Sequence, residues 1–212
     1  MAAAAEPVRA SRRGLISLKR FVFLLLGALT LVTIYEHETP LLNPTNPEWS
    51  HIAPFRWWLV PHILTAAVAL VIGPLQFSTT LRRRNLALHR WLGRIYACAV
   101  LVASAIALYI GVAFEVPENR WLMGSMAGLW LMVTVCAWLA ARHGDINQHK
   151  LWIIRSYALT FTFVTTRFIP DKILPGMGYA GVTALYWVLI VSSLLLPDLL
   201  VNGGAILRRR PH

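Results

Sequence analysis

The chain has 212 residues, of which 57% are hydrophobic and 14% are charged, and its mean hydropathy is +0.58. A soluble domain carries about a quarter charged residues, so this composition excludes an ordinary soluble protein and indicates a membrane protein. The net charge of +11 does not indicate nucleic-acid binding, because no zinc-finger spacing, RNA-binding aromatic motif or long basic helix accompanies it.

Apolar segments suited to crossing a bilayer follow one another along the chain. A spanning helix needs about 20 mostly apolar residues, because the hydrocarbon core is about 30 Å thick. Six segments qualify: Phe21–Tyr35, Trp57–Thr79, Trp91–Phe114, Trp121–Ala141, Leu151–Ile169 and Thr183–Val201. We therefore predict an all-α, polytopic membrane bundle of six transmembrane helices. It forms a single membrane domain over residues 1–212, with a four-helix core over residues 57–170.

The first apolar segment follows basic residues, as the apolar region of a signal peptide does. No small-residue cleavage site comes after it, since Tyr35 to Glu38 are bulky or charged. We interpret this segment as an uncleaved signal anchor and residues 1–20 as a basic cytoplasmic segment. The following loop, Glu36 to Arg56, contains four prolines, which favour an extended conformation. The loop from Asp171 to Gly181 is predicted to be irregular as well.

Lys and Arg residues in the loops predict the orientation of the bundle, because they gather on the cytoplasmic side. One side of the predicted bundle would hold only Arg56, Arg120 and Lys172. The other side would hold Arg9, Arg12, Arg13, Lys19, Arg20, Arg82, Arg83, Arg84, Arg90, Arg94, Arg142, Lys150, Arg208, Arg209 and Arg210. We therefore expect both termini to be cytoplasmic in a multi-pass protein of the bacterial inner (plasma) membrane.

A faint internal repeat relates the two predicted inner loops. Arg82 to Arg90 can be overlaid on Arg142 to Lys150 at an offset of 60 residues, which aligns the histidines and the basic residues at both ends. The intervening residues do not match, so chance similarity of two basic loops competes with a true repeat. The overlay places His89 and His149 at the start of parallel helices, at one membrane depth.

Two histidines at one depth on different helices are suited to bis-histidine ligation of haem b. Each neutral imidazole offers one nitrogen to the iron, and an apolar bundle supplies a dry site. His89 and His149 are the candidate ligands of the iron. Arg94 and Arg155, with Arg90, are candidate partners of the propionates, and Gly93 would let a flat macrocycle approach its helix. The competing interpretation is that both histidines are hydrated side chains at the bilayer boundary.

Other ionisable residues in the predicted spans are functional candidates, because such groups are costly in a membrane. His62 and Arg167 could line an outer polar site for a quinone head group, although His62 could equally form a helix-to-helix hydrogen bond. Asp198, at the depth of Arg94 and Arg155, suggests an ion pair. A metal site of His37, Glu38 and His51 has no strong zinc spacing.

Several motifs taken together resemble a bacterial membrane family known as domain of unknown function 2306. The motifs are Pro61-His62 with Gly73-Pro74-Leu75-Gln76-Phe77, His89-Arg90-Trp91-Leu92-Gly93-Arg94-Ile95-Tyr96, and His149-Lys150-Leu151-Trp152-Ile153-Ile154-Arg155-Ser156-Tyr157 with Arg167. The resemblance covers about residues 57 to 170. It implies a shared membrane topology and no established activity.

More distantly, the arrangement is similar to the transmembrane di-haem cytochromes b that use ascorbate and reduce ferric iron. That resemblance implies two haems, held by histidines on helices two and four and on helices three and five. His62, His89 and His149 match helices two, three and five, whereas the overlay places Leu122 where the helix-four histidine would be. The resemblance therefore implies one inner haem, ligated by His89 and His149.

These observations favour a membrane electron carrier that binds haem b and is linked to quinol or to a membrane redox partner. A cofactor-free accessory or assembly subunit of a membrane complex and a small transporter are the alternatives. The transporter lacks the paired broken helices at mid-membrane depth that many transporters have. The sequence contains no hydrolase motif, and whether the protein is an enzyme stays open.

Overall fold

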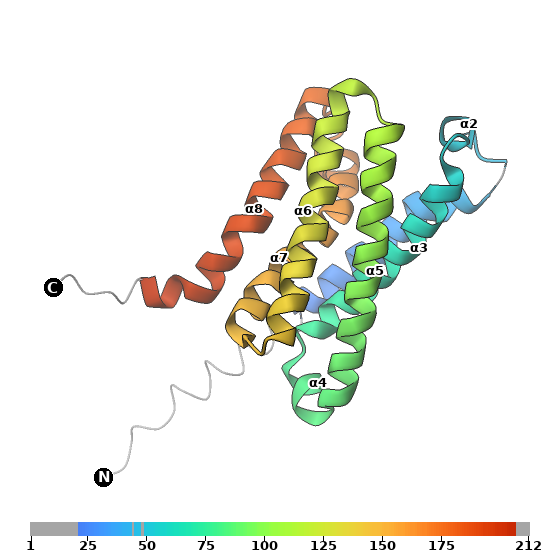
Figure 1. Ribbon diagram of the computed structural model, residues 1–212. Helices are drawn as coiled ribbons and strands as arrows, with labels where there is room; N and C mark the ends of the chain where they lie inside the picture. Colours follow the sequence, from blue (N-terminus) through green and yellow to red (C-terminus); the bar gives the residue numbers. More distant parts are fainter. Residues whose placement is uncertain (1–20, 44, 48, 207–212) are drawn as a thin grey trace, which may run out of the picture.

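The computed structural model describes residues 21–43, 45–47 and 49–206, and every regular element in these ranges is helical (Figure 1). The first helical segment, Phe21–Glu38, ends in the π-helical turn η1 (Ile34–Glu38). The following elements are η2 (Pro40–Leu42), α2 (Trp49–Ile52), α3 (Arg56–Gln76), α4 (Thr79–Arg84), α5 (Leu86–Ala113), α6 (Pro117–Arg142), α7 (Ile146–Phe168), η3 (Ile169–Ile173) and α8 (Tyr179–Ile206). The predicted all-α fold is confirmed for these residues.

The described helices include five that are long and apolar enough to cross a membrane. They are Phe21–Glu38, α3, α5, α6 and the part Tyr179–Leu199 of α8. The helix predicted as the fifth span, α7, is long enough at 23 residues but is not among them. Its sequence carries Lys150, Arg155 and Arg167 together with several threonines and serines. The membrane character is thus supported, and the sixth span stays a prediction.

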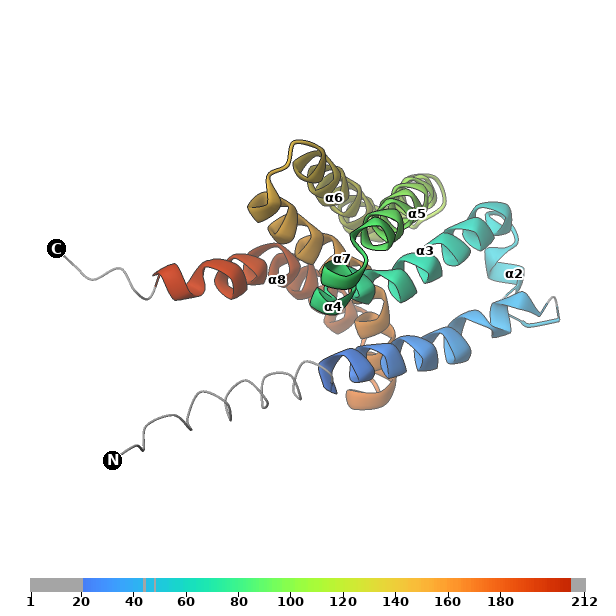
Figure 2. The ribbon, with the colours of Figure 1, turned by 90° about the horizontal axis from the view of Figure 1, so that it is seen from below.

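Helices that follow one another in the chain pack side by side. Contacts join α3 to α5, α5 to α6, α6 to α7 and α7 to α8, and α7 also meets α3. The helices α3, α5, α6 and α7 therefore form a ring, and Figure 2 shows the first helix and α8 outside it. The predicted basic segment 1–20 and Arg208 to Arg210 lie outside the described residues, so their side of the membrane stays a prediction.

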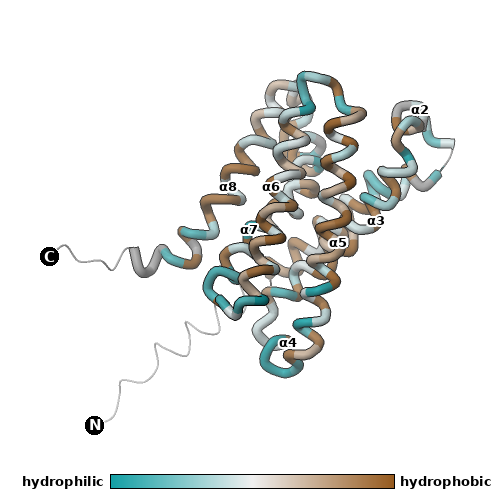
Figure 3. The backbone as a smooth tube through the Cα atoms, viewed as in Figure 1, coloured by the Kyte–Doolittle hydropathy of each residue, from teal (hydrophilic) through white to brown (hydrophobic). Residues whose placement is uncertain are grey.

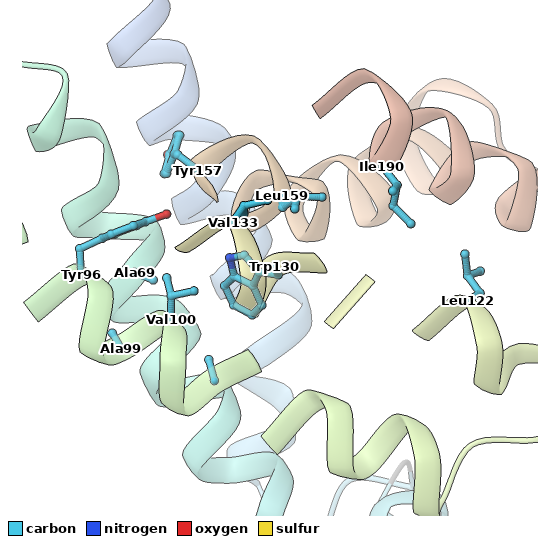
Figure 4. Packing of buried hydrophobic residues seen from close by; sticks show 11 residues of the cluster. Ala69, Tyr96, Ala99, Val100, Leu122, Trp130, Val133, Tyr157, Leu159 and Ile190 are labelled. Carbon is cyan, nitrogen blue, oxygen red and sulfur yellow. The ribbon is translucent and has the colours of Figure 1, made fainter. Parts of the chain in front are cut away.

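The core lies between the helices of this ring (Figure 4). Tyr96 and Val100 of α5, Val133 of α6 and Leu159 of α7 are each at most 1% exposed. Trp130 of α6 and Tyr157 of α7 fill the space beside them. Tight packing and hydrogen bonds, rather than a difference in hydrophobicity, have to hold such helices together in lipid.

Two connections differ from the sequence-based expectation. The first helix continues to Glu38, and α2 forms further along, so the segment predicted to be extended is partly helical. In the inner loop, α4 forms between α3 and α5 because Ser78 caps it: the Ser78 hydroxyl accepts a hydrogen bond of 3.2 Å from the Leu81 N–H. Figure 3 shows hydrophilic residues at α4 and at the turn between α6 and α7, at the same end of the bundle.

Candidate functional site

Equivalent N-caps place His89 and His149 at the same position of their helices. The side chain of Asn85 accepts a hydrogen bond from Leu88 N–H at the start of α5, and that of Asp145 accepts one from Gln148 N–H at the start of α7. Each histidine is the fourth residue after its cap, and its N–H bonds the carbonyl of the cap residue. The two caps, like the two histidines, are 60 residues apart, which gives the faint repeat a structural basis.

The two histidines differ in what holds their rings. His149 Nδ1 lies 2.9 Å from the carbonyl oxygen of Ala137 in α6, so it donates to that oxygen and leaves Nε2 available. His89 Nδ1 is buried and has no hydrogen-bond partner. Arg82, His149 and Arg90 all act electrostatically on His89, which therefore lies in a cationic surrounding.

Gln76, at the end of α3, lies against the helix of His89. A Cβ built on Gly93 would meet Gln76 Oε1 at 3.0 Å, and Gln76 Nε2 is buried without a hydrogen-bond partner. Gly93 was predicted to make room for a macrocycle, and in the structure the end of this flexible amide occupies that room. Sequence reasoning did not select Gln76, although it directly precedes the basic inner loop.

Arg94 and Arg155, two of the predicted propionate partners, differ in exposure and in the contacts of their side chains. Arg94 is exposed. Arg155 donates to the carboxylate of Asp198 at 2.5 Å and to the Leu194 carbonyl at 3.0 Å, and its guanidinium stacks over Trp152 at 4.3 Å. The predicted ion pair of Asp198 is therefore formed, with Arg155. These contacts direct Arg155 to α8. The arginines that act electrostatically on His89 are Arg82 and Arg90.

Tyr96 and Ser156, each seven residues after one of the two histidines, belong to a buried network of hydrogen bonds. Tyr96 Oη is 2.8 Å from Ser156 Oγ and 3.1 Å from Thr160 Oγ1, and Ser156 Oγ is 2.7 Å from Thr134 Oγ1. Trp130 Nε1 donates to Thr160 Oγ1 at 2.9 Å. These polar groups satisfy one another in the core and join α5, α6 and α7. The one sequence feature that could have indicated this network is the number of Ser and Thr residues in α7.

At the other end of the bundle, His62 has a structural partner. Its Nδ1 lies 2.8 Å from the Ala103 carbonyl oxygen of α5, which is the helix-to-helix hydrogen bond weighed above. Arg167 lies with its guanidinium 5.4 Å from the centre of the Phe163 ring and acts electrostatically on Glu38. Within the described residues no hydrogen bond or ion pair joins His62 to Arg167, and Arg167 acts electrostatically on Glu38 without forming an ion pair with it.

Glu38 is a functional candidate that the sequence analysis placed in a loop. It ends η1, is 6% exposed, and neither carboxylate oxygen has a hydrogen-bond partner. Among the described residues no three His, Cys, Asp or Glu side chains form a metal-binding group. The side chain of His51 lies outside the described part, so the suggested site of His37, Glu38 and His51 stays a prediction.

The α4 end of the bundle offers two imidazoles, which are donors that haem iron accepts. Two imidazoles begin parallel helices, one ring is oriented through Nδ1 by a backbone carbonyl, and the other has a buried nitrogen without a partner. A backbone acceptor on the second ring nitrogen is the usual outer support of a metal-binding histidine. The residues present therefore fit an axial ligand pair, with the amide of Gln76 as the group that would have to move.

The comparisons with known proteins agree with the membrane character. Residues 59–202 match the model of a family described as predicted membrane protein DUF2306. No curated protein and no solved structure matches the chain. The more distant similarity to di-haem cytochromes b is not shown by these comparisons.

Proposed function

The chain belongs to the DUF2306 family of predicted membrane proteins, and we propose that it is a haem b-binding electron carrier of the bacterial inner membrane. The observation that carries this proposal is the paired placement of His89 and His149, each four residues after a side-chain N-cap at the start of its helix. The proposal includes six membrane crossings and cytoplasmic termini.

The neighbours of α7 support the proposed sixth crossing. The helices α6 and α8 are both long and apolar enough to cross a membrane, and α7 packs against each of them. Residues 143–145 join α6 to α7, and η3 with residues 174–178 joins α7 to α8, so we infer that α7 returns across the bilayer between them. The hydroxyl groups of Ser156 and Thr160 face protein, where Tyr96, Trp130 and Thr134 bond them. A helix with these partners tolerates a polar composition that lipid would not.

The inner residues would have separate roles. His89 and His149 would each hold the haem through one imidazole nitrogen, and the Ala137 carbonyl would hold the His149 ring in the tautomer that presents Nε2. Arg82 and Arg90 would balance the negative propionates. When bound, the haem would supply a one-electron couple. The bundle core, closed by the Tyr96 hydroxyl network, would exclude water from it.

A lipid-soluble quinone is the proposed redox partner, because the apolar helices place the proposed haem in contact with the bilayer in which a quinone dissolves. The second proposed partner is a membrane protein complex that would accept or deliver the electrons. Both partners belong to the proposal rather than to the observed contacts.

The absorption spectrum of the detergent-purified protein, expressed with ample haem, tests the proposal. We expect a Soret band and, in the reduced-minus-oxidised spectrum, a symmetric α band. His89→Ala and His149→Ala should each abolish the α band, whereas His143→Ala should retain it, because His143 is an exposed histidine at the same end of the bundle. A well-folded protein without haem would refute the proposal and leave the cofactor-free accessory subunit.

A further inference from the structure

A groove lies between the first helix and α3. Its volume is about 410 Å³, and clefts that hold small ligands have volumes of about 300–1,000 Å³. The lining residues recur every three or four positions, so each helix contributes one face to the groove. They include Phe23, Gly27 and Leu31 on one side and Leu70, Pro74 and Ser78 on the other.

The lining of the groove favours an apolar occupant. Its two hydroxyl side chains are already bonded to the backbone: Thr30 Oγ1 donates to the Leu26 carbonyl at 2.8 Å, and Ser78 Oγ accepts from the Leu81 N–H at 3.2 Å. The other lining residues are apolar or glycine. A Cβ built at Gly27 would meet nothing within 4 Å, so open space lies directly beside this glycine. A hydrocarbon chain suits such a lining.

The groove is about as long as one leaflet of a bilayer is deep. Leu70 and Ser78 are eight positions apart, which is about 12 Å at a helical rise of about 1.5 Å per residue. Half of the hydrocarbon core is about 15 Å. Leu31 and Val71, which also line the groove, are 66% and 56% exposed, so the groove is open to its surroundings. An acyl chain of the surrounding leaflet can therefore enter it from the side.

Three arginines lie just beyond the α4 end of the groove. Ser78 both lines the groove and caps α4, and its carbonyl accepts a hydrogen bond of 3.1 Å from the Arg82 N–H. The last turn of α4 consists of Arg82, Arg83 and Arg84, all of them exposed, and Figure 3 shows this region as hydrophilic. Basic residues at the membrane surface beside a gap between helices attract negative lipid head groups.

The head group has to decide which lipid is bound. Lipid tails are as apolar as the groove, so an acyl chain alone would not select one lipid from another. We propose that the groove holds an acyl chain of an anionic phospholipid and that the arginines of α4 bind the phosphate of the same molecule. This lipid would join the first helix to α3. The proposal does not rest on haem binding.

Native mass spectrometry of the detergent-purified full chain tests the site. The anionic probe is dioleoylphosphatidylglycerol, and the zwitterionic probe is dioleoylphosphatidylcholine. We expect the wild type to retain one phosphatidylglycerol at least about tenfold more tightly, which corresponds to about 1.4 kcal/mol. Gly27→Leu should lose the retained lipid, because the new side chain fills the groove. Gly128→Leu is the matched control, since a Cβ there also meets nothing within 4 Å but the residue lies in α6.

A second pair of variants tests the head-group contact. Arg83→Gln combined with Arg84→Gln should remove the preference for phosphatidylglycerol and leave a lipid bound. Arg142→Gln combined with Lys150→Gln removes the same charge from exposed residues at the same end of the bundle. This control should keep the preference, because neither residue lines the groove.

Equal retention of the two lipids by the wild type, or equal behaviour of Gly27→Leu and Gly128→Leu, would overturn the inference. If Gly27→Leu does not fold, the wild type is titrated with lysophosphatidylglycerol, which has one acyl chain, and with glycerol 3-phosphate, which has none. Only the first should be retained, and retention of glycerol 3-phosphate would show a phosphate site that does not need the groove. A dimer in place of a lipid-bound monomer, abolished by Gly27→Leu, would assign the groove to a second copy of the chain.

Discussion

Gly73 of α3 provides the sharpest test of how the bundle is packed. A Cβ built at this position would lie well under 3.0 Å from the ring carbons Cδ2 and Cε2 of Tyr157, and 3.2 Å from Cε2 of Tyr96. The Tyr157 ring cannot easily withdraw, because Phe77 and Phe161 pack on it at 5.6 and 6.2 Å between ring centroids. Gly73→Ala should therefore force α3 and α7 apart.

The magnitude follows from two contributions. Overpacking a filled core costs about 1–3 kcal/mol. Displacing the ring also weakens at least one aromatic pair, which contributes about 0.5–1.5 kcal/mol. Alanine is the better helix former by about 1 kcal/mol, but this gain is common to any helical glycine and cancels against a control. Gly128 of α6 is that control, because a Cβ there meets nothing within 4 Å.

Reversible unfolding in mixed micelles, compared among variants, measures the effect. We expect Gly73→Ala to be less stable than Gly128→Ala by about 2–4 kcal/mol. Combining Gly73→Ala with Tyr157→Leu should recover part of the loss, since the obstructing ring is then removed. Equal stability of the two alanine variants would refute the packing of Tyr157 against α3.

Two further experiments test the polar contacts of α7. Tyr96→Phe should lower the free energy of unfolding by about 1 kcal/mol, because hydrogen bonds between membrane helices average about 0.6 kcal/mol and this hydroxyl bonds both Ser156 and Thr160; an unchanged unfolding midpoint would contradict the network. Arg155→Gln and Asp198→Asn should be coupled by about 0.5–1 kcal/mol in a double-mutant cycle, since Asp198 is partly exposed; additive effects would show that the pair does not hold α8.

Hydropathy predicted the positions of the apolar helices well, because lipid-exposed helices have to be apolar along their whole length. It predicted the depth of Arg155 and Asp198 as well, and the ion pair between them is confirmed. Hydropathy placed the end of the first helix too early. The apolar run ends at Tyr35, but a π-helical turn carries the helix on to Glu38. A residue expected in a loop thereby became a buried carboxylate.

The sequence predicts the positions of His89 and His149 along their helices, but it does not predict which side chains pack around them. Their shared depth follows from equal spacing along the chain, and the polar caps Asn85 and Asp145 could have been recognised from the rule for helix starts. The approach of Gln76 to Gly93 and of Tyr157 to Gly73 depends on how α3 crosses its neighbours. No local pattern specifies such a crossing, because either glycine could equally have faced lipid.

The polar make-up of α7 has a consequence for how the protein is made. In the proposed topology, α7 is too hydrophilic to move by itself from the translocon into the bilayer. It would have to wait there until α8 has been synthesised, and then enter the bilayer with its hydroxyl groups already covered. Chains cut just before Tyr179 should therefore leave this segment uninserted and be degraded, whereas cuts within the last turn of α8 should be tolerated.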